Sequence, residues 1–216
     1  MPGVKICGLT DEAGLEAALA GGARYVGFVF HPASPRHAGD LARAGALAAR
    51  ARGRAKIVAV TVDPDDALLT ALTAQLQPDY VQLHGGETPA RVAEARKIAS
   101  AGVIKALQIA GASDLDAAAA FEAVADFLLF DAKAPPGADR PGGHGAAFDW
   151  RILAGRSFAR PWFLSGGLTS DNVAAATALS GARLVDVSSG VERGPGLKDP
   201  ALIAAFLDAA KAPQAV

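Results

Sequence analysis

The clearest pattern for predicting the fold lies at residues 161–190, which read PWFLSGGLTSDNVAAATALSGARLVDVSSG. An apolar run at 161–166 ends in a glycine turn, an alanine-rich segment follows Ser170-Asp171-Asn172, and a second apolar run covers 183–189. Ser, Asp and Asn are favoured at helix N-caps, whereas short runs rich in β-branched and aromatic residues favour strands. The stretch therefore predicts a strand, a helix and a second strand parallel to the first.

The same alternation extends over the whole chain of 216 residues. Six apolar runs precede the two above, at 3–7, 25–30, 56–62, 79–84, 103–107 and 126–131. Further helix starts are expected at Thr10-Asp11-Glu12, Asp63-Pro64, Thr88-Pro89, Ser113-Asp114 and Asp199-Pro200. Eight such units can close into a barrel, and no linker is long enough to divide the chain. The predicted fold class is α/β, a single-domain TIM (β/α)8 barrel over residues 1–216.

Composition excludes several classes of function. The 21 Lys and Arg residues nearly balance 22 Asp and Glu, so the formal charge of -1 gives no field to gather nucleic acid or an anionic membrane. The start, MPGVKICGLT, has no signal core, and no apolar stretch approaches the ~18 residues of a membrane span. One cysteine and four scattered histidines argue against a metal site. We therefore expect a cytoplasmic protein with a small-molecule partner, no nucleic acid or membrane partner, and no metal.

Two residues at predicted strand ends could carry chemistry, because the active site of such a barrel lies at the carboxyl ends of the strands. Cys7 ends the first strand just before a helix, whose N-terminus favours a thiolate, but a buried core cysteine is the alternative. Asp131 ends the apolar run DFLLFD and could instead be a turn residue paired with Lys133. As a catalytic acid, Asp131 would need a raised pKa.

Glycine and serine turns after the seventh and eighth strands are candidates for binding a phosphate. Such loops are a recurring phosphate site in barrel enzymes, because glycine lets backbone N–H groups approach an anion closely. A single Gly-Gly turn would be weak evidence, but two turns lie at the expected strands, and GGHG at 142–145 could add a third. The candidate phosphate-binding residues are Gly143, Gly145, Gly166, Gly167, Ser188, Ser189 and Gly190.

Lys5 and Asp186 are expected to pair inside the barrel. Alternation along the first strand places Lys5 on the same inward side as Cys7, and the eighth strand adjoins the first when the barrel closes. A lone buried ammonium is costly, so loss of Asp186 should destabilise or inactivate the protein. A reactive Schiff-base lysine at Lys5 or Lys105 is the alternative.

Arg36, His84 and the segment 132–147 complete the candidate site. His84 ends the fourth strand and is treated as a pocket residue, while Arg36 could pair with a substrate carboxylate or simply lie on the surface. The segment 132–147 is rich in glycine and proline and follows the sixth strand, which is typical of a mobile active-site loop.

Six motifs resemble, in order, the signature of the phosphoribosylanthranilate isomerase family. They are KICGLT (5–10), GFVFHPASPR (27–36), VQLHG (81–85), GGHG (142–145) with FDW (148–150), SGGLTSDNV (165–173) and DVSSGVERGPGLKD (186–199). The resemblance implies an Amadori rearrangement of N-(5-phosphoribosyl)anthranilate in tryptophan biosynthesis, with no cofactor or metal. It assigns the base to Cys7, the acid to Asp131, the substrate carboxylate to Arg36, and the phosphate to the turns after strands seven and eight.

The chain departs from the family pattern at two places, and rival functions stay open. His144 replaces the usual threonine of the GG-T-G loop, and VAVTVD at 58–63 lacks the glycine that is more common there. The rivals are the histidine-pathway isomerase, whose base is an aspartate where Cys7 stands, a Schiff-base aldolase, and a phosphate-binding barrel without activity. Whether the chain is a monomer or a homodimer is left open.

Overall fold

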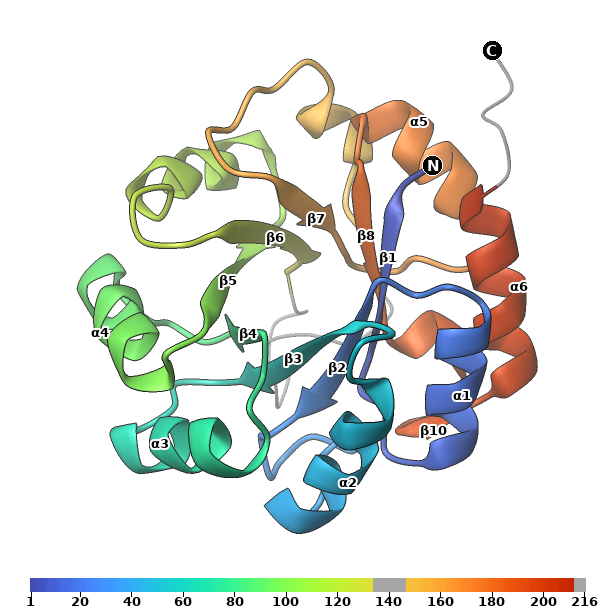
Figure 1. Ribbon diagram of the computed structural model, residues 1–216. Helices are drawn as coiled ribbons and strands as arrows, with labels where there is room; N and C mark the ends of the chain where they lie inside the picture. Colours follow the sequence, from blue (N-terminus) through green and yellow to red (C-terminus); the bar gives the residue numbers. More distant parts are fainter. Residues whose placement is uncertain (134–146, 212–216) are drawn as a thin grey trace.

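The computed structural model describes residues 1–133 and 147–211, and its eight parallel strands form a closed barrel (Figure 1). Pairing of the first strand with the eighth closes it, with Lys5 opposite Asp186. The predicted fold class is therefore confirmed. The strands are β1 (Gly3–Cys7), β2 (Tyr25–Val29), β3 (Lys56–Thr61), β4 (Tyr80–Leu83), β5 (Gly102–Ile109), β6 (Phe127–Ala132), β7 (Trp162–Leu164) and β8 (Leu184–Val187).

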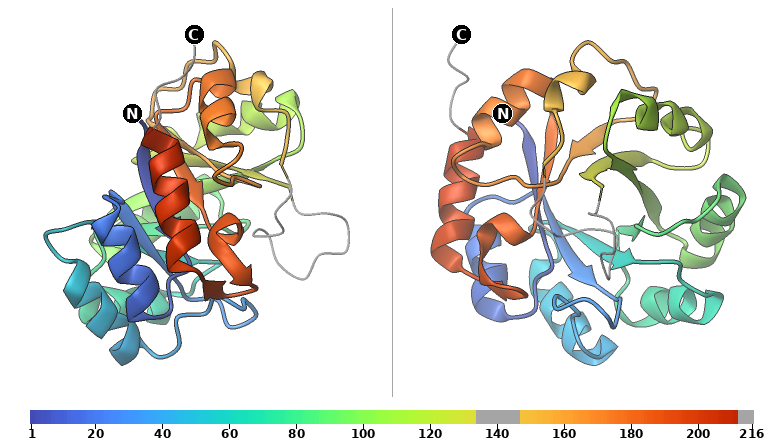
Figure 2. Two further views of the ribbon diagram at one scale, coloured as in Figure 1. Left: turned by 90° about the vertical axis from the view of Figure 1, so that its right-hand side faces the viewer. Right: turned by 180° about the vertical axis from the view of Figure 1, so that it is seen from behind.

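Helices surround the strands on the outside of the barrel (Figure 2). Two predicted caps are confirmed, since the side chains of Asp11 and Thr88 accept hydrogen bonds from the first turns of their helices. Among the described residues, no helix is long and apolar enough to cross a membrane. The α-helices are α1 (Glu12–Ala20), α2 (Leu41–Ala51), α3 (Asp66–Gln75), α4 (Pro89–Ala99), α5 (Val173–Ser180) and α6 (Pro200–Lys211).

The helix start predicted at Asp63-Pro64 is wrong. Helix α3 begins at Asp66, and Asp65 caps it. A helix N-cap normally has an extended backbone, as Thr88 has before Pro89, whereas Asp63 has a left-handed backbone with φ of 45°. The carboxylate of Asp63 then accepts a hydrogen bond from the Gly86 amide at 2.8 Å, so this residue ties two loops together rather than capping a helix.

The segment predicted to be helical after Ser113-Asp114 forms a 3₁₀ helix, η1 (Ala112–Ala120), rather than an α-helix. The Asp114 carboxylate accepts hydrogen bonds from the amides of Ala110 and Gly111, which fixes a tight first turn. Two further short 3₁₀ helices and a hairpin were not predicted. They are η2 (Trp150–Leu153), η3 (Ser189–Val191), β9 (Glu192–Gly194) and β10 (Leu197–Lys198).

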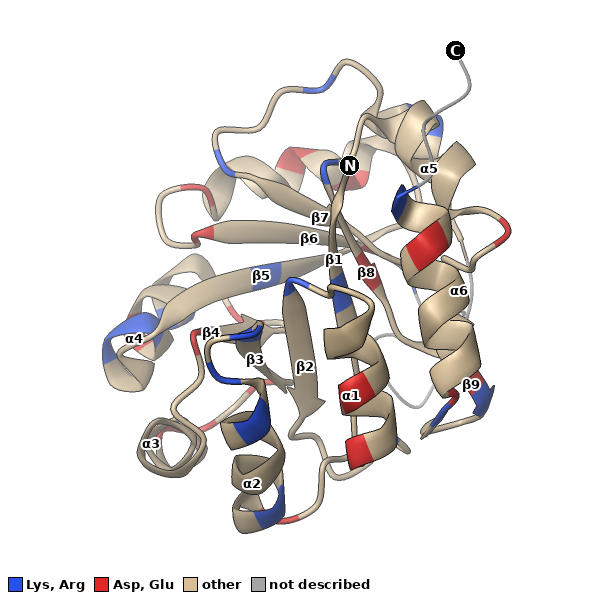
Figure 3. Ribbon diagram, turned by 45° about the vertical axis from the view of Figure 1, so that its right-hand side comes forward, with Lys and Arg blue, Asp and Glu red and all other residues tan. Residues whose placement is uncertain are grey.

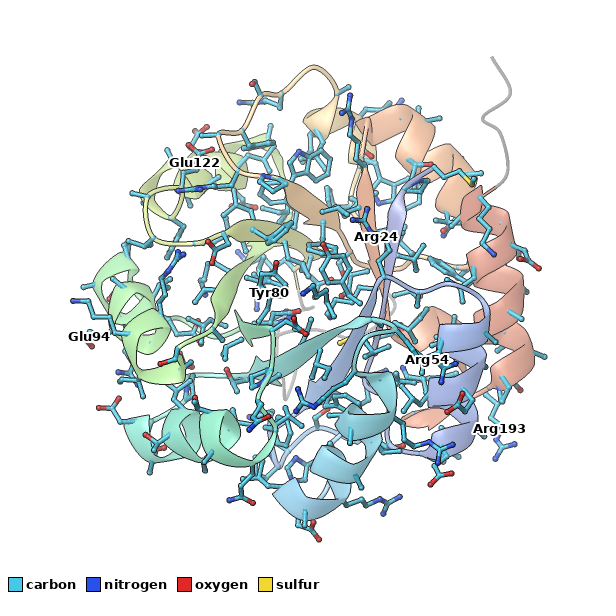
Figure 4. The ribbon with its side chains drawn as sticks, in the orientation of Figure 1. Arg24, Arg54, Tyr80, Glu94, Glu122 and Arg193 are labelled. Carbon is cyan, nitrogen blue, oxygen red and sulfur yellow. The ribbon has the colours of Figure 1, made fainter. Side chains whose placement is uncertain are left out.

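Aromatic side chains fill the barrel at the amino ends of the strands. Tyr25, Tyr80 and Phe127 begin alternate strands, and Phe163 packs against them from β7. The ring centroids of Tyr25 and Phe163 lie 5.1 Å apart, and those of Tyr80 and Phe127 lie 5.3 Å apart in edge-to-face contact. Figure 4 shows Tyr80 in the middle of the barrel. The contacts among these rings close the amino end of the interior.

Candidate active site

Several of the inward-facing residues at the carboxyl ends of the strands are polar, although those of β2 and β3 are Val29 and Val60. Successive residues of a strand face opposite sides, so Cys7 faces the barrel interior like Lys5, and Asp131 faces it like Leu129. Figure 3 shows most other charged residues on the helices and loops around the barrel. The predicted base and acid therefore lie on the inner side of the sheet, at the end where barrel enzymes hold their sites.

Cys7 is buried at the end of β1. The next residue, Gly8, has φ of 78°, and a Cβ there would lie 2.9 Å from the Cδ of Arg36. The carbonyl oxygen of Cys7 accepts a hydrogen bond from Ser188 Oγ at 3.1 Å, which links β1 to the turn after β8. Burial raises the pKa of the Cys7 thiol, although the ammonium of Lys5 partly opposes that effect.

Asp131 is hydrogen-bonded to His84. Oδ2 of Asp131 lies 3.2 Å from Nε2 of His84, and Oδ1 accepts a hydrogen bond from the Ala132 amide at 3.0 Å. Gln82 faces the same side of β4 as His84, and its Nε2 lies 2.9 Å from Nδ1 of the imidazole. With the amide donating, Nδ1 accepts and Nε2 donates its hydrogen to Asp131. The structure thus joins two predicted site residues directly.

The predicted pair of Lys5 and Asp186 is confirmed. Lys5 Nζ lies 2.9 Å from Asp186 Oδ1, and Ser165 Oγ donates to Asp186 Oδ2 at 3.2 Å. Burial is the largest single influence and works to lower the pKa of Lys5, but the charges and hydrogen bonds of Asp186 and Cys7 together outweigh burial and raise that pKa. A protonated lysine is a poor nucleophile, so this geometry does not favour a Schiff base at Lys5.

Arg36 is buried and engaged by a carboxylate of the protein itself. Its Nε and Nη2 donate to Glu192 at 2.7 and 2.8 Å, a bidentate arrangement. Glu192 also accepts a hydrogen bond from Lys198 Nζ at 2.7 Å, and Lys198 donates to the carbonyl of Ser188 at 2.8 Å. Burial works to raise the pKa of Glu192, but Arg36 and Lys198 outweigh it and lower that pKa. This cluster connects the β2 loop with the turn after β8.

The glycine turns after β7 and β8 lie against each other. A Cβ on Gly190 would collide with the carbonyl oxygen of Leu168, and one on Gly166 would lie 2.6 Å from the Ala132 amide nitrogen. Gly166 and Gly167 have φ of 88° and 64°, a conformation that favours glycine. Between described residues, the amides of Gly166, Gly167, Ser189 and Gly190 donate no hydrogen bond. The two predicted turns are thus neighbours with amides available to an anion.

Lys105 lies on the outer side of β5 and not in the barrel. Its Nζ lies 2.6 Å from Glu87 Oε2 and donates to the Gly85 carbonyl at 2.8 Å. Glu87 also accepts hydrogen bonds from the amides of Asp63 and Gly85. A cavity of about 500 Å³ borders this cluster and is lined by the loops after β3 and β4, by β5 itself and by Phe121. Lys105 therefore holds loops together, and the geometry does not favour a Schiff base there either.

Several predicted residues lie outside the described residues, and several site residues were missed. Gly143, His144, Gly145 and most of the segment 132–147 fall in the undescribed part, so their predicted roles stay predictions. The residues missed are Gln82, Ser165, Glu192 and Lys198. Side chains alternate along a strand, so the position of His84 indicates that Gln82 also faces the barrel interior. Ser165 lies in a glycine turn and has no separate signal in the sequence. Within 1–133 and 147–211, no group of three or more His, Cys, Asp or Glu side chains could hold a metal ion.

Sequence comparisons match one family. The family model described as N-(5′-phosphoribosyl)anthranilate (PRA) isomerase matches residues 4–209. N-(5′-Phosphoribosyl)anthranilate isomerase from Caulobacter sp. strain K31 is 56% identical over 207 residues, which are 96% of this chain and 97% of that protein. The enzyme of the same name from Rhodopseudomonas palustris strain BisB18 is 56% identical over 98% of this chain and 96% of its own length.

Solved structures agree with the sequence comparisons. Phosphoribosyl anthranilate isomerase from Thermotoga maritima superposes with a TM-score of 0.86 and 34% identity, covering 98% of this chain and 99% of that one. The structure of such an enzyme in complex with reduced 1-(o-carboxyphenylamino)-1-deoxyribulose 5-phosphate has a TM-score of 0.83 and 32% identity, with the same coverage. Both similarities extend over nearly the whole chain.

Proposed function

The chain belongs to the N-(5′-phosphoribosyl)anthranilate isomerase family and converts phosphoribosylanthranilate to 1-(2-carboxyphenylamino)-1-deoxyribulose 5-phosphate in tryptophan biosynthesis, and from that premise we propose that Cys7 is its general base and Asp131 its general acid. The observation that carries the proposal is that both side chains face the inside of the barrel at its carboxyl end. Metal-free proton transfer of this kind requires one donor and one acceptor.

The proposed reaction proceeds in two proton transfers. Asp131 gives a proton to the furanose ring oxygen, the bond from that oxygen to C1 breaks, and the anthranilate nitrogen becomes a Schiff base. Cys7, as the thiolate, then removes the proton on C2 and leaves an enolamine, which tautomerises to the ketone. The hydrogen bond from His84 fixes the direction of the Asp131 carboxyl group, and this would favour proton transfer to the furanose ring oxygen.

The remaining candidate residues are proposed to bind the substrate. The turns after β7 and β8, with Gly166, Gly167, Ser188, Ser189 and Gly190, would hold the phosphate through their amides. Gly143 and Gly145 would add to that cradle. Arg36 would bind the anthranilate carboxylate, and its pairing with Glu192 fixes the plane of the guanidinium before substrate arrives.

Loss of substrate fluorescence, followed with freshly prepared phosphoribosylanthranilate, tests the catalytic pair. We expect Cys7→Ser and Asp131→Asn each to lose about 10²–10⁴-fold in kcat, the worth of a positioned acid or base. Asp208→Asn, an exposed change on α6, is the matched control and should retain full activity. Near-parental turnover by either site variant would remove that residue from the mechanism.

We further propose a cytoplasmic location, where this biosynthetic step would take place, and we leave both a monomer and a homodimer as candidate states. A Thermotoga maritima homologue, 32% identical to this chain, is described as a dimeric enzyme from which monomers have been generated. Sedimentation of the purified protein over a range of concentrations would distinguish the two states.

A further inference from the structure

Lys5 is a fully buried cation on the same strand and the same face as the proposed base. It stands two residues before Cys7 on β1, and its exposed fraction is 0%. The salt bridge to Asp186 neutralises the charge of the Lys5 ammonium, but it does not explain why the ammonium lies beside the thiol. Replacing a buried ion pair with apolar residues is often neutral for stability, so the pair needs a further reason to be there.

The sulfur of Cys7 and the ammonium of Lys5 lie against the same bare stretch of backbone. Gly27 on β2 is paired with Cys7 in the sheet. A Cβ at Gly27 would lie 3.1 Å from Cys7 Sγ and 3.2 Å from Lys5 Nζ. The absence of a side chain at Gly27 therefore lets the two groups approach each other, and any larger residue would intrude on both.

Asp186 and Ser165 hold the ammonium in place. Asp186 Oδ1 accepts from Lys5 Nζ at 2.9 Å, and Asp186 Oδ2 accepts from Ser165 Oγ at 3.2 Å. Both oxygens of the carboxylate are thus engaged, one by β1 and one by the turn after β7. A cation fixed in this way can act on a nearby charge without first reorganising, which is the condition for strong electrostatic stabilisation.

We propose that Lys5 is a positioning residue for the proton transfer at Cys7, its ammonium facing the sulfur and stabilising the thiolate. The thiol first releases its proton to solvent, and the thiolate then takes the C2 proton while the electrons of the C2–H bond remain on the substrate. Two charged groups besides Lys5 act on this sulfur, Asp186 from β8 and Lys198 from β10. The ammonium of Lys198 is already bonded to Ser188 and Glu192. This inference rests on the proposed role of Cys7.

The contribution of Lys5 to the thiol pKa agrees with this role. Burial raises the pKa of Cys7, and the charge of Lys5 is the largest effect that opposes the rise. Without Lys5, the thiolate would be rarer at neutral pH. Lys105 provides the contrast, because it is also buried and ion-paired but lies on the outer side of the barrel, bound to Glu87.

The single cysteine of the chain makes the test direct. The ultraviolet absorbance of the thiolate is titrated in the parent protein, with Cys7→Ser as the blank. In Lys5→Met we expect the thiol pKa to rise by about one unit or more, a roughly tenfold smaller thiolate fraction at neutral pH. Lys105→Met, the matched buried lysine, should leave the thiol pKa unchanged.

A second variant keeps the test possible if Lys5→Met alone does not fold. Lys5→Met combined with Asp186→Asn removes both charges of the pair, and the amide oxygen introduced on β8 could still accept the hydrogen bond from Ser165. The thiol pKa should rise here too, because the effect of Lys5 on the sulfur is larger than that of Asp186. In both variants kcat should fall and recover as the pH is raised, with little change in KM.

An unchanged thiol pKa in either folded variant would overturn the role of Lys5. A fall in activity that does not recover at higher pH would also count against it, since a purely structural role has no reason to follow the titration of the sulfur. The outcome is separable from the proposed function. If Cys7→Ser turned over normally, the base assignment would fail, whatever the titration of Lys5→Met showed.

Discussion

The two ends of the barrel are made by the same strands and have opposite chemistry. At the amino end, the rings of Tyr25, Tyr80, Phe127 and Phe163 contact one another and close the interior. In the middle of the barrel, Lys5 and Asp186 are paired, and at the carboxyl end His84 and Asp131 are hydrogen-bonded. The aromatic end gains stability by removing apolar surface from water, whereas the polar end places charged groups where burial is costly.

Stability and reactivity are therefore separated along the strands. Ring packing depends on volume and tolerates no water, but it needs no particular hydrogen bond. A buried polar group must be paired, and pairing also fixes its direction. The amino end can therefore offset the cost of the polar end without taking part in the reaction.

The largest expected effect on this comparison comes from emptying the aromatic end. Phe163→Ala should lower the free energy of unfolding by about 3–5 kcal/mol, because a fully buried ring is lost and a cavity remains. Chemical denaturation measures the change. Activity per folded molecule should stay close to that of the parent, and Phe163→Leu should show a smaller loss. A large fall in kcat with little loss of stability would show that the aromatic end also takes part in the reaction.

A smaller effect is expected from the support of His84. Gln82→Leu removes the group that faces Nδ1, so the imidazole loses the hydrogen bond that fixes its tautomer. We expect kcat to fall by about 2–13-fold, which corresponds to one hydrogen bond of about 0.5–1.5 kcal/mol. Steady-state kinetics measure it.

Gln82→Glu sharpens this test. A glutamate would accept a hydrogen from Nδ1, so a neutral imidazole would present its bare Nε2 to Asp131. Its activity should fall further than that of Gln82→Leu. Equal activities for the two variants would show that the tautomer of His84 has no influence on Asp131.

The smallest expected effect is the response of the polar end to acid. The pKa of Glu192 is lowered in the folded protein, so its stabilising contribution is present above the ordinary glutamate pKa of about 4.5 and is lost as the pH falls through the lowered value. Thermal unfolding followed from pH 6 down to about pH 3 should show this loss. Glu192→Gln should weaken that part of the pH dependence, and an identical acid profile would contradict the assignment.

Much of the fold could be predicted from the sequence, because each strand–helix unit has local signals. The caps at Asp11 and Thr88 and the eight apolar runs follow from residue type alone. The error at Asp63 came from a contact that is distant in sequence, since its carboxylate bonds the Gly86 amide. The 3₁₀ form of η1 depends on how Asp114 folds back on its own first turn.

The site was predictable where one strand position carried the information. Cys7, His84 and Asp131 were proposed as site residues because each lies at the end of an apolar run, and Lys5 was correctly paired with Asp186 because closure makes β1 and β8 neighbours. Arg36 was expected to face a substrate carboxylate, but its partnership with Glu192 was not foreseen. That partner lies 156 positions away, in a hairpin with no clear apolar pattern.

Alternation and capping are local properties of the chain, so the barrel, its strand order and the groups near the strand ends could be predicted from residue order alone. Most contacts between those groups are known only from the folded structure. It placed Lys5 beside Cys7 in the space left by Gly27, and it put Lys105 on the outer side with Glu87. Such contacts depend on closure, tilt and side-chain reach, which bring together residues that no local pattern connects.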